Sequence, residues 1–163
     1  MIIHPIAPLF DESSKILILG SFPSVKSREN MFFYSHPQNR FWKVLCGVLG
    51  HKDVKTIEEK RAFILNQKIA LWDVIASCNI SGSSDSSIKD VVPNDLSVIL
   101  DNAEIEEIFV NGKTAYKYYN KFIRDKIDRE AVCLPSTSPA NAMWSLERLI
   151  ADWEIIKSVL AEE

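Results

Sequence analysis

Residues 34–42, with the sequence YSHPQNRFW, are chemically richer than the start of a helix requires. They hold three aromatic rings, a histidine and an asparagine just where a helical pattern of apolar residues begins. On that helix Phe41 belongs to the core face, and Asn39 lies about 200° from it, which turns the amide away from the core. The residues alone leave Asn39 open as an exposed helix position or as part of a site. His36 reads most simply as a first-turn residue, and Trp42 as core.

Two further polar loops could meet this stretch. Residues 20–24, GSFPS, follow the apolar run at 15–19, and residues 136–141, STSPAN, follow the apolar run at 131–134. If both runs are strands of a parallel sheet, both loops leave at its carboxyl edge, where ligands bind in such folds. The sequence therefore predicts a site at that edge.

Several familiar kinds of site have no support in the sequence. GSFPS is neither G-x-G-x-x-G nor a P-loop, and no HExxH or Ser-His-Asp order stands out. Cys46, Cys78 and Cys133 are far apart and form no CxxC pair. We therefore predict no metal site and no disulfide, and a reducing cytoplasm as the location.

Length and composition predict a single domain over residues 1–163. The formal net charge of −3 argues against a strongly basic nucleic-acid coat, although a basic groove can exist locally. The start, MIIHPIAPLF, is a poor signal peptide, and no apolar run approaches the roughly 18 residues that span a membrane.

The elements that would position these loops alternate between short apolar strands and helices. This pattern favours a three-layer α/β/α sandwich around a short, mainly parallel four-stranded sheet. Strands are predicted at residues 15–19, 69–75, 108–110 and 131–134. Helices are predicted at residues 36–49, 57–66, 95–101, 112–124 and 143–160. Residues 21–33 are predicted as a long loop, and the polar segment 81–87, SGSSDSS, as either a mobile lid or a linker.

The predicted helix at 36–49 carries start and stop signals. Ser35 and Gln38 fit the S-x-x-Q capping box, and Pro37 suits a first turn. Gly50 can end the helix.

Four segments and one short motif together carry a family resemblance. They are ILILGSFPS, HPQNRFWKVL, VNGKTAYK and LPSTSPANA, with W-D-V at residues 72–74. In this order, over almost the whole chain, they resemble the uracil-DNA glycosylase superfamily. The mismatch-specific uracil branch is similar in H-P-x-N-x-F-W-K and G-K-x-A. The resemblance is closer to the hypoxanthine-DNA (deoxyinosine) glycosylase branch, in G-S-F-P, H-P-x-N-x-F-W, W-D-V and S-T-S-P-A-N.

Two departures from the uracil-cleaving branches bear on the substrate. Where those branches place a water-positioning Asn or Asp, this chain has Phe22, and where they place a histidine that stabilises the departing uracil, it has Ser136. In the hypoxanthine branch the water is positioned by the asparagine of H-P-x-N. The resemblance thus implies that Asn39 is catalytic and orients the water through its side-chain carbonyl.

The resemblance also implies the residues around the base and the DNA. The expected base pocket comprises Gly20, Ser21, Phe22, Pro23, Phe33, Tyr34, His36 and Ser136. The expected DNA-binding residues are Ser24, Thr137, Ser138, Pro139, Ala140, Asn141, Lys113 and Lys117. Core packing remains an alternative for Phe22 and Phe33, as does capping of the last helix for Ser138 or Asn141. Lys113, Lys117, Lys121 and Arg124 form one helical stripe, which is either a solvated face or a duplex-steering surface.

The implied activity is that of a monofunctional DNA glycosylase, a monomer without metal or cofactor, acting on double-stranded DNA that contains a deaminated base, with hypoxanthine favoured. A glycosylase for uracil in G:U mismatches is the nearest alternative. A catalytically silent damaged-DNA-binding domain and an unrelated small-molecule hydrolase remain open as well.

Overall fold

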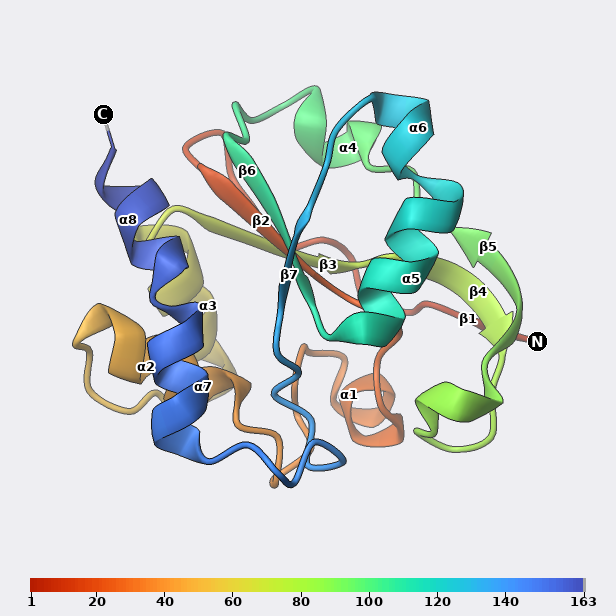
Figure 1. The fold of residues 1–163 in the computed structure, drawn as a ribbon, viewed down its shortest axis with the longest axis horizontal. Coiled ribbons are helices and arrows are strands. Elements are labelled where there is room, and N and C mark those ends of the chain that lie inside the picture. The colour runs from red at the N-terminus through yellow and green to blue at the C-terminus, as the bar shows by residue number, and fades with distance from the viewer. Residues whose placement is uncertain (163) are drawn as a thin grey trace.

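A four-stranded parallel sheet forms the centre of the protein, shown in Figure 1 as a computed structural model that describes residues 1–162. The strand order is β3-β2-β6-β7, and every neighbouring pair is parallel. The strands are β2 (Ile16–Gly20), β3 (Ile69–Asp73), β6 (Glu107–Asn111) and β7 (Val132–Leu134). All five residues of β2 are buried, which explains why its sequence is apolar throughout rather than alternating.

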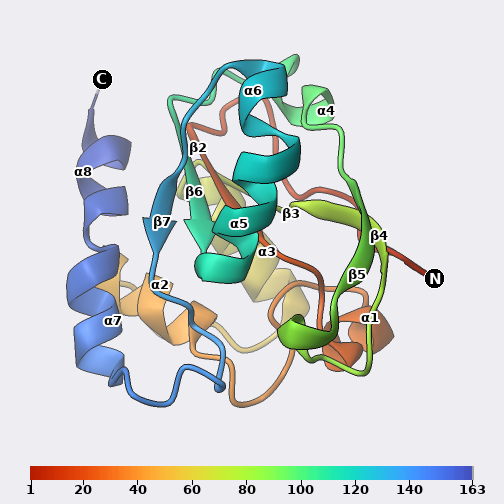
Figure 2. The same cartoon turned by 45° about the vertical axis from the view of Figure 1, so that its right-hand side comes forward.

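Helices cover both faces of this sheet, which confirms the three-layer prediction (Figures 1 and 2). Ile16 and Ile18 of β2 face a core built with α2 (Phe41–Leu49), α3 (Ile57–Asn66), α7 (Leu146–Trp153) and α8 (Ile155–Ala161). Leu17 and Leu19 face the opposite core, built with α4 (Ser97–Leu100) and α5 (Lys113–Phe122), beside α6 (Arg124–Ile127). Alternate residues of one strand therefore serve the two cores.

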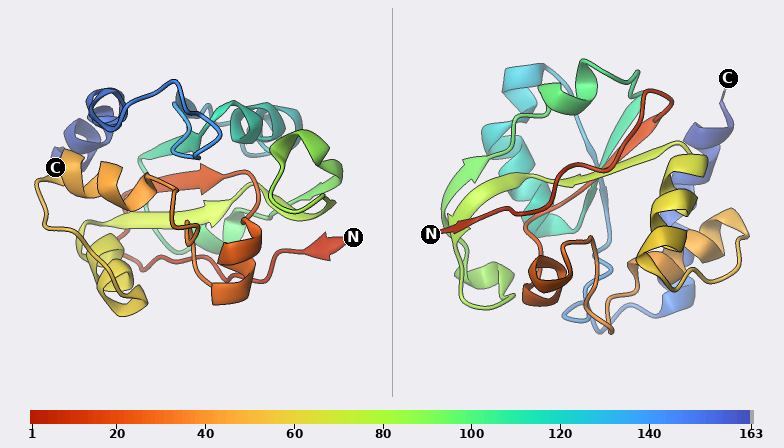
Figure 3. Two further views of the ribbon diagram at one scale, coloured as in Figure 1. Left: turned by 90° about the horizontal axis from the view of Figure 1, so that it is seen from below. Right: turned by 180° about the vertical axis from the view of Figure 1, so that it is seen from behind.

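A second sheet was not predicted. It is antiparallel, in the order β1-β4-β5, and comprises β1 (Ile2–Ile3), β4 (Ile75–Asn79) and β5 (Lys89–Pro93). The predicted strand at 69–75 is divided at Val74, because the chain leaves one sheet there and enters the other. Figure 3 shows this sheet at the N-terminal end of the fold. Its connecting loop contains the 3-10 helix η1 (Asp85–Ser87).

Two predictions near the site were wrong. The predicted loop at 21–33 contains α1 (Val25–Asn30), which Ser24 caps by accepting a hydrogen bond from the Ser27 N–H. The predicted helix at 36–49 begins only at Phe41. Ser35 makes no capping box, because its hydroxyl donates to the Phe32 carbonyl and its N–H donates to Ser27 Oγ.

Two other helices are shorter than predicted. The helix at 112–124 ends at Phe122, so Arg124 lies on the separate α6. The helix at 143–160 begins at Leu146 and is divided at Glu154. Within residues 1–162, no helix has the length and apolar composition that a membrane crossing needs.

Candidate active site

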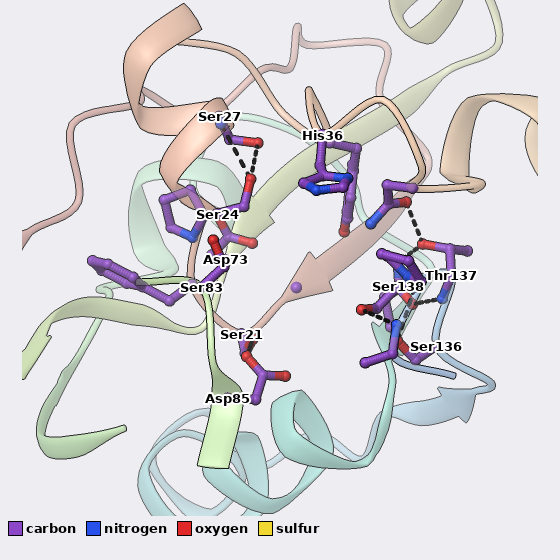
Figure 4. Close-up of a pocket in the computed structure, with 18 of the residues that line it drawn as sticks. Ser21, Ser24, Ser27, His36, Asp73, Ser83, Asp85, Ser136, Thr137 and Ser138 are labelled. Carbon is purple, nitrogen blue, oxygen red and sulfur yellow. Dashed lines mark hydrogen bonds between the residues drawn. The ribbon is translucent and has the colours of Figure 1, made fainter. Parts of the chain in front are cut away.

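A cavity of about 490 Å³ lies at the carboxyl edge of the parallel sheet (Figure 4). Three of its lining residues end strands: Gly20 ends β2, Asp73 ends β3 and Asn111 ends β6. The loop after β7 contributes residues 136–140. The parallel topology thus gathers loops that are far apart in the sequence around one pocket.

Most of the predicted site residues line this pocket. They are Gly20, Ser21, Phe22, Pro23, Ser24, Phe33, Tyr34, His36, Asn39, Ser136, Thr137, Ser138, Pro139 and Ala140. Asn141, Lys113 and Lys117 are not among its lining residues. Sequence reasoning missed Ser27, Asp73 and Asn111, which also line the walls. Residues 83–86, which belong to the segment predicted as a lid or a linker, complete them.

Asn39 lies in a turn before α2 and is half-buried, so of its two alternatives the exposed helix position is wrong. Its Oδ1 accepts hydrogen bonds from the Phe41 N–H at 2.9 Å and from Thr137 Oγ1 at 2.9 Å. The Arg40 N–H donates to the Thr137 carbonyl, 3.1 Å away. These bonds tie the turn to the loop after β7, which is why residues 35–40 do not join the helix.

The same bonds decide which end of the Asn39 amide is free. Asn111 Nδ2 donates to Thr137 Oγ1 at 3.0 Å, so the Thr137 hydroxyl hydrogen is available to Asn39. Both lone pairs of Asn39 Oδ1 are then used, and no other described residue accepts a hydrogen bond from Asn39 Nδ2. The free group is the N–H₂ donor, whereas the resemblance implied that the side-chain carbonyl would orient the water.

Thr137 is fully buried, which changes its expected role. Its hydroxyl lies between Asn111 and Asn39, and its N–H donates to Asn111 Oδ1 at 3.1 Å. Thr137 therefore holds Asn39 from behind, and the predicted DNA contact cannot come from its side chain.

Arg40 fastens the loop after β7 to the start of α2. Its guanidinium donates to the carbonyl oxygens of Trp144, of Ser138 at 3.3 Å and of Asn141 at 3.0 Å. Three backbone carbonyls of one loop are thus held by one planar group, a geometry that suits Arg and not Lys. Sequence reasoning did not single out Arg40, because its partners are about a hundred residues away.

We expect Arg40→Ala to weaken both binding of lesion-containing DNA and base excision by about tenfold, because the loop that lines the pocket loses its anchor. Arg148→Ala is the matched control, since it removes the same charge and a stack on Trp144 at 3.8 Å without freeing the loop carbonyls. Binding titrations and single-turnover rates for both variants check this expectation. Equal losses in the two variants would show that Arg40 acts only through its charge.

Three aromatic side chains line the pocket. Phe22 and Phe33 are buried, and Tyr34 stacks on Phe41 with the ring centroids 3.9 Å apart. Tyr34 has a positive φ of 53°, a backbone conformation that costs free energy for a residue with a Cβ. Core packing and pocket lining were alternatives for the two phenylalanines, and the structure shows that each does both.

The floor of the pocket holds a buried polar cluster. The Asp73 carboxylate accepts a hydrogen bond from His4 Nε2 at 2.7 Å, and both side chains are almost fully buried. The Tyr34 hydroxyl is buried without a hydrogen-bond partner in the described chain. Burial, together with the nearby charge of Asp73, raises the pKa of Tyr34 well above its usual range. At neutral pH this phenol is therefore a neutral donor.

The serine-rich segment forms a wall of the pocket. Ser83 Oγ accepts from the Val25 N–H at 2.9 Å, and Ser21 Oγ donates to Asp85 Oδ1 at 3.2 Å. The surrounding wall removes water from the Asp85 carboxyl group and raises its pKa, although the residue as a whole is exposed. Of the two alternatives for this segment, a mobile lid or a linker, these contacts argue against a linker, because they dock the segment on the pocket.

Two of the remaining predicted DNA-binding residues make hydrogen bonds within their own loop. Ser138 Oγ accepts from the Ala140 N–H, and Asn141 Nδ2 donates to the Ser136 carbonyl. Neither caps the last helix, because Ser145 caps α7. Lys113 and Lys117 are exposed on α5. The predicted stripe stops within α5, since Arg124 lies on another helix.

Comparison with known proteins decides the family. The family model described as the uracil DNA glycosylase superfamily matches residues 7–158. The chain belongs to the uracil DNA glycosylase superfamily. The resemblance seen in its motifs is confirmed, and with it the expectation of a DNA glycosylase.

Relatives within the superfamily agree in sequence and in fold. A protein named hypoxanthine DNA glycosylase from Methanosarcina barkeri (strain Fusaro / DSM 804) is 34% identical over 137 residues, which cover 82% of this chain and 85% of the relative. Its namesake from Methanosarcina acetivorans is 33% identical over 150 residues, 91% of this chain and 93% of the relative. A solution NMR structure from Methanosarcina acetivorans, provisionally named a uracil DNA glycosylase, has a TM-score of 0.81 at 31% identity and covers 96% of this chain and 97% of that one.

Proposed function

We propose that this DNA glycosylase removes hypoxanthine from double-stranded DNA by hydrolysis and leaves an abasic site. The observation that carries the proposal is the pocket in which the Asn39 amide is fixed by Thr137 and Phe41 with its N–H₂ group free. Its volume, about 490 Å³, lies in the range of small-molecule sites. The relatives named for hypoxanthine support the choice of base.

The first step is the entry of a flipped nucleotide, since a base inside the duplex cannot be reached. The rings of Phe22 and Tyr34 line the pocket and can stack on the flipped base. Stacking of this kind contributes about 1–3 kcal/mol per base in single-strand binders. It holds the base in place while the glycosidic bond breaks.

Bond cleavage builds positive charge on the sugar and negative charge on the base. Asn39 is not a general base, because an amide side chain does not take up a proton near neutral pH. Its Nδ2–H₂ group instead donates to the oxygen of a water molecule and leaves a lone pair directed at C1′, which suffices if the bond is largely broken before attack. Backbone N–H groups of the loop 20–24 supply hydrogen bonds to the base as its charge grows.

The substitutions at two family positions argue against uracil as the preferred base. Phe22 is a buried ring that offers no group to position a water, and Ser136 Oγ is already the acceptor for the Ser138 N–H at 3.1 Å. Neither residue can replace the amide, carboxylate or imidazole of the uracil-cleaving branches. Uracil in a G:U mismatch is therefore the second candidate.

We expect deoxyinosine to be excised at least about tenfold faster than deoxyuridine in matched duplexes, because one lost hydrogen bond to the leaving base is worth roughly that factor. A panel of duplexes, each with one deaminated base and assayed with and without a chelator, measures this.

Faster removal of uracil opposite guanine would overturn the choice of base. Binding without cleavage would favour the silent domain, and indifference to DNA would favour a small-molecule hydrolase. Loss of activity in the chelator would contradict a metal-free reaction.

The proposed setting of the enzyme follows from the same features. DNA is the partner, and the reaction needs neither a metal ion nor an organic cofactor, since a positioned amide and hydrogen-bond donors to the base carry it. We also propose that it acts as a monomer in the cytoplasm, where its three free thiols would stay reduced.

A further inference from the structure

A second, smaller cavity adjoins the candidate active site. Its volume is about 260 Å³. Tyr34, His36 and Asn39 line both this cavity and the pocket at the carboxyl edge of the sheet, so the turn at residues 34–39 borders the two. The cavity is smaller than the usual site for a whole small molecule, which suits it to one group of a larger ligand.

Positive charge predominates around this second cavity, which we call the lysine cavity. Its lining includes Lys43 of α2, Lys60 of α3 and Lys55 of the connection between them, against one acidic residue, Asp53. Within residues 1–162, none of the three lysines forms an ion pair with a carboxylate. In a chain whose formal net charge is −3, this is a local surplus of positive charge, and it attracts an anion.

Lys60 is held in place and has lost part of its hydration. Its ammonium nitrogen lies 5.3 Å from the centroid of the Trp42 ring, whose face attracts a cation. The Trp42 indole N–H donates to the Phe33 carbonyl at 3.3 Å, so the ring itself is fixed. Burial lowers the pKa of Lys60, because the charged form is the one that loses water. An anion in the lysine cavity would replace that lost hydration.

His36 supplies a further donor on the shared wall. The Gln38 N–H donates to His36 Nδ1 at 3.1 Å, so Nδ1 carries the lone pair and Nε2 carries the proton. In the described part of the chain, no hydrogen bond joins His36 Nε2 to another residue. Its N–H group is therefore free for a ligand beside the turn.

We propose that the lysine cavity binds a phosphate of the DNA strand next to the flipped nucleotide, with Lys60 as the main contact. The inference rests on the proposed function, which places the sugar at Asn39. The phosphates on either side of that sugar are only a few bonds from C1′, and Asn39 itself lines the lysine cavity. Lys43 and Lys55 are exposed and add long-range attraction to the same group.

This site lies on the other side of the sheet from the lysines that the sequence singled out. The helices α2 and α3 pack on one face of the sheet, and α5, which carries Lys113 and Lys117, packs on the opposite face (Figure 1). Phosphate contacts fix the register of a protein on DNA. A contact in the lysine cavity would therefore hold the strand on the side of the pocket that α5 does not reach.

Three variants isolate the charge of Lys60. Lys60→Met removes the charge and keeps an unbranched apolar side chain over Trp42, and Lys60→Arg restores the charge. Lys68→Met is the matched control, because Lys68 is exposed and directly precedes β3, at the opposite, amino edge of the sheet.

The probe is a DNA duplex with one tetrahydrofuran abasic analogue, which carries no base and cannot be cleaved. Single methylphosphonates, which are neutral, replace the phosphates around the analogue one at a time. With the parent protein, we expect one of these positions to lower the affinity by about tenfold, the effect of one hydrogen bond to a charged group. With Lys60→Met, the unmodified duplex should bind about tenfold more weakly, and the methylphosphonate at that position should cost less than about threefold.

Salt dependence gives a second readout. The slope of log affinity against log salt concentration should become shallower by about one in Lys60→Met, because one phosphate contact is lost. Lys60→Arg should recover the parent slope and the parent methylphosphonate profile. Lys68→Met should match the parent in both.

An unchanged methylphosphonate profile in Lys60→Met would overturn the inference even if the affinity fell, since a structural effect does not remove the cost at one phosphate. Thermal melts verify folding. If Lys60→Met does not fold, Lys43→Met replaces an exposed side chain of the same cavity and should reduce the cost at the same position. Failure of the proposed function looks different, because the parent would then leave hypoxanthine in cleavable DNA, while the abasic duplex still reports the phosphate contacts.

Discussion

Replacing Asn39 with alanine is expected to slow base excision by on the order of 10²-fold or more, the scale seen when a positioned catalytic group is lost. The reason is geometric. Oδ1 is held by the Phe41 N–H and the Thr137 hydroxyl, so the Nδ2–H₂ group of this pocket-lining residue has a fixed direction. Alanine removes the amide that we propose to hold a water molecule opposite the leaving base. Affinity for lesion-containing DNA should change by less than about tenfold, because phosphate contacts dominate it.

The same substitution also has a cost in stability, which the sequence did not predict. An exposed helix position would tolerate alanine, but Asn39 accepts a hydrogen bond from a hydroxyl group that is fully buried. Leaving that donor unpaired should lower the free energy of unfolding by about 1–3 kcal/mol. A rate measured on Asn39→Ala must therefore be compared with that of an equally destabilised protein.

Thr137→Val supplies the comparison, because it removes the same hydrogen bond from its other end, together with the one that Asn111 Nδ2 donates to the hydroxyl, and leaves the Asn39 amide in place. We expect a similar loss of stability but a smaller loss of rate, about tenfold at most, since the Phe41 N–H still orients the amide. Single-turnover excision, denaturant unfolding and a binding titration on both variants separate the effects. If the two variants lost the same factor in rate, Asn39 would be structural only.

The parallel sheet and its helices could be predicted because their signals are local. Runs such as ILIL are apolar throughout, and in β2 every residue is buried between two helical layers. Once the strands are parallel, the loops that follow them must meet at one edge. This is why the segments 20–24 and 136–140 were placed together correctly from sequence alone.

The details of the site depended on contacts between distant residues. A helix start at His36 agrees with every local signal, yet the Arg40 N–H donates to the Thr137 carbonyl and keeps residues 35–40 out of the helix. The orientation of the Asn39 amide depends on Thr137, 98 residues away. No local pattern carries such information.

Asp73 was missed for a related reason. It stands inside the apolar run IALWDVI, where one carboxylate looks like an interruption of a strand. Its partner, His4, is 69 residues away and directly follows β1, a short strand of the second sheet, which was not predicted. The W-D-V motif marked this position in the resemblance, but it did not say that the carboxylate lies under the pocket.

Adding one methyl group at Gly20 is expected to abolish most of the activity, with a loss of about 10²-fold, the effect of displacing site groups by about 1 Å. Gly20 ends β2 directly beneath the pocket, and a Cβ there would lie 2.5 Å from Asp73 Oδ1 and 3.0 Å from the Tyr34 hydroxyl. Asp73 cannot retreat freely, because His4 holds its other oxygen and both side chains are buried. The methyl group must therefore displace the floor of the pocket.

Gly47→Ala is the matched control for this crowding. A Cβ at Gly47 would lie 2.5 Å from Ile150 Cδ1, between α2 and α7 and outside the pocket. Both substitutions overpack the fold, which should lower the free energy of unfolding by about 1–3 kcal/mol. The loss should be smaller at Gly47, because the end of Ile150 is flexible and alanine has a better helix propensity than glycine. Only Gly20→Ala should lose excision when both proteins are assayed below their melting temperatures. An active Gly20→Ala protein would mean that the floor beside Asp73 and Tyr34 does not contact the base. An inactive Gly47→Ala protein would show that crowding elsewhere in the fold also disturbs the site. The contrast between the two variants assigns the loss to the pocket, because they share the added group and differ in what lies 2.5 Å away.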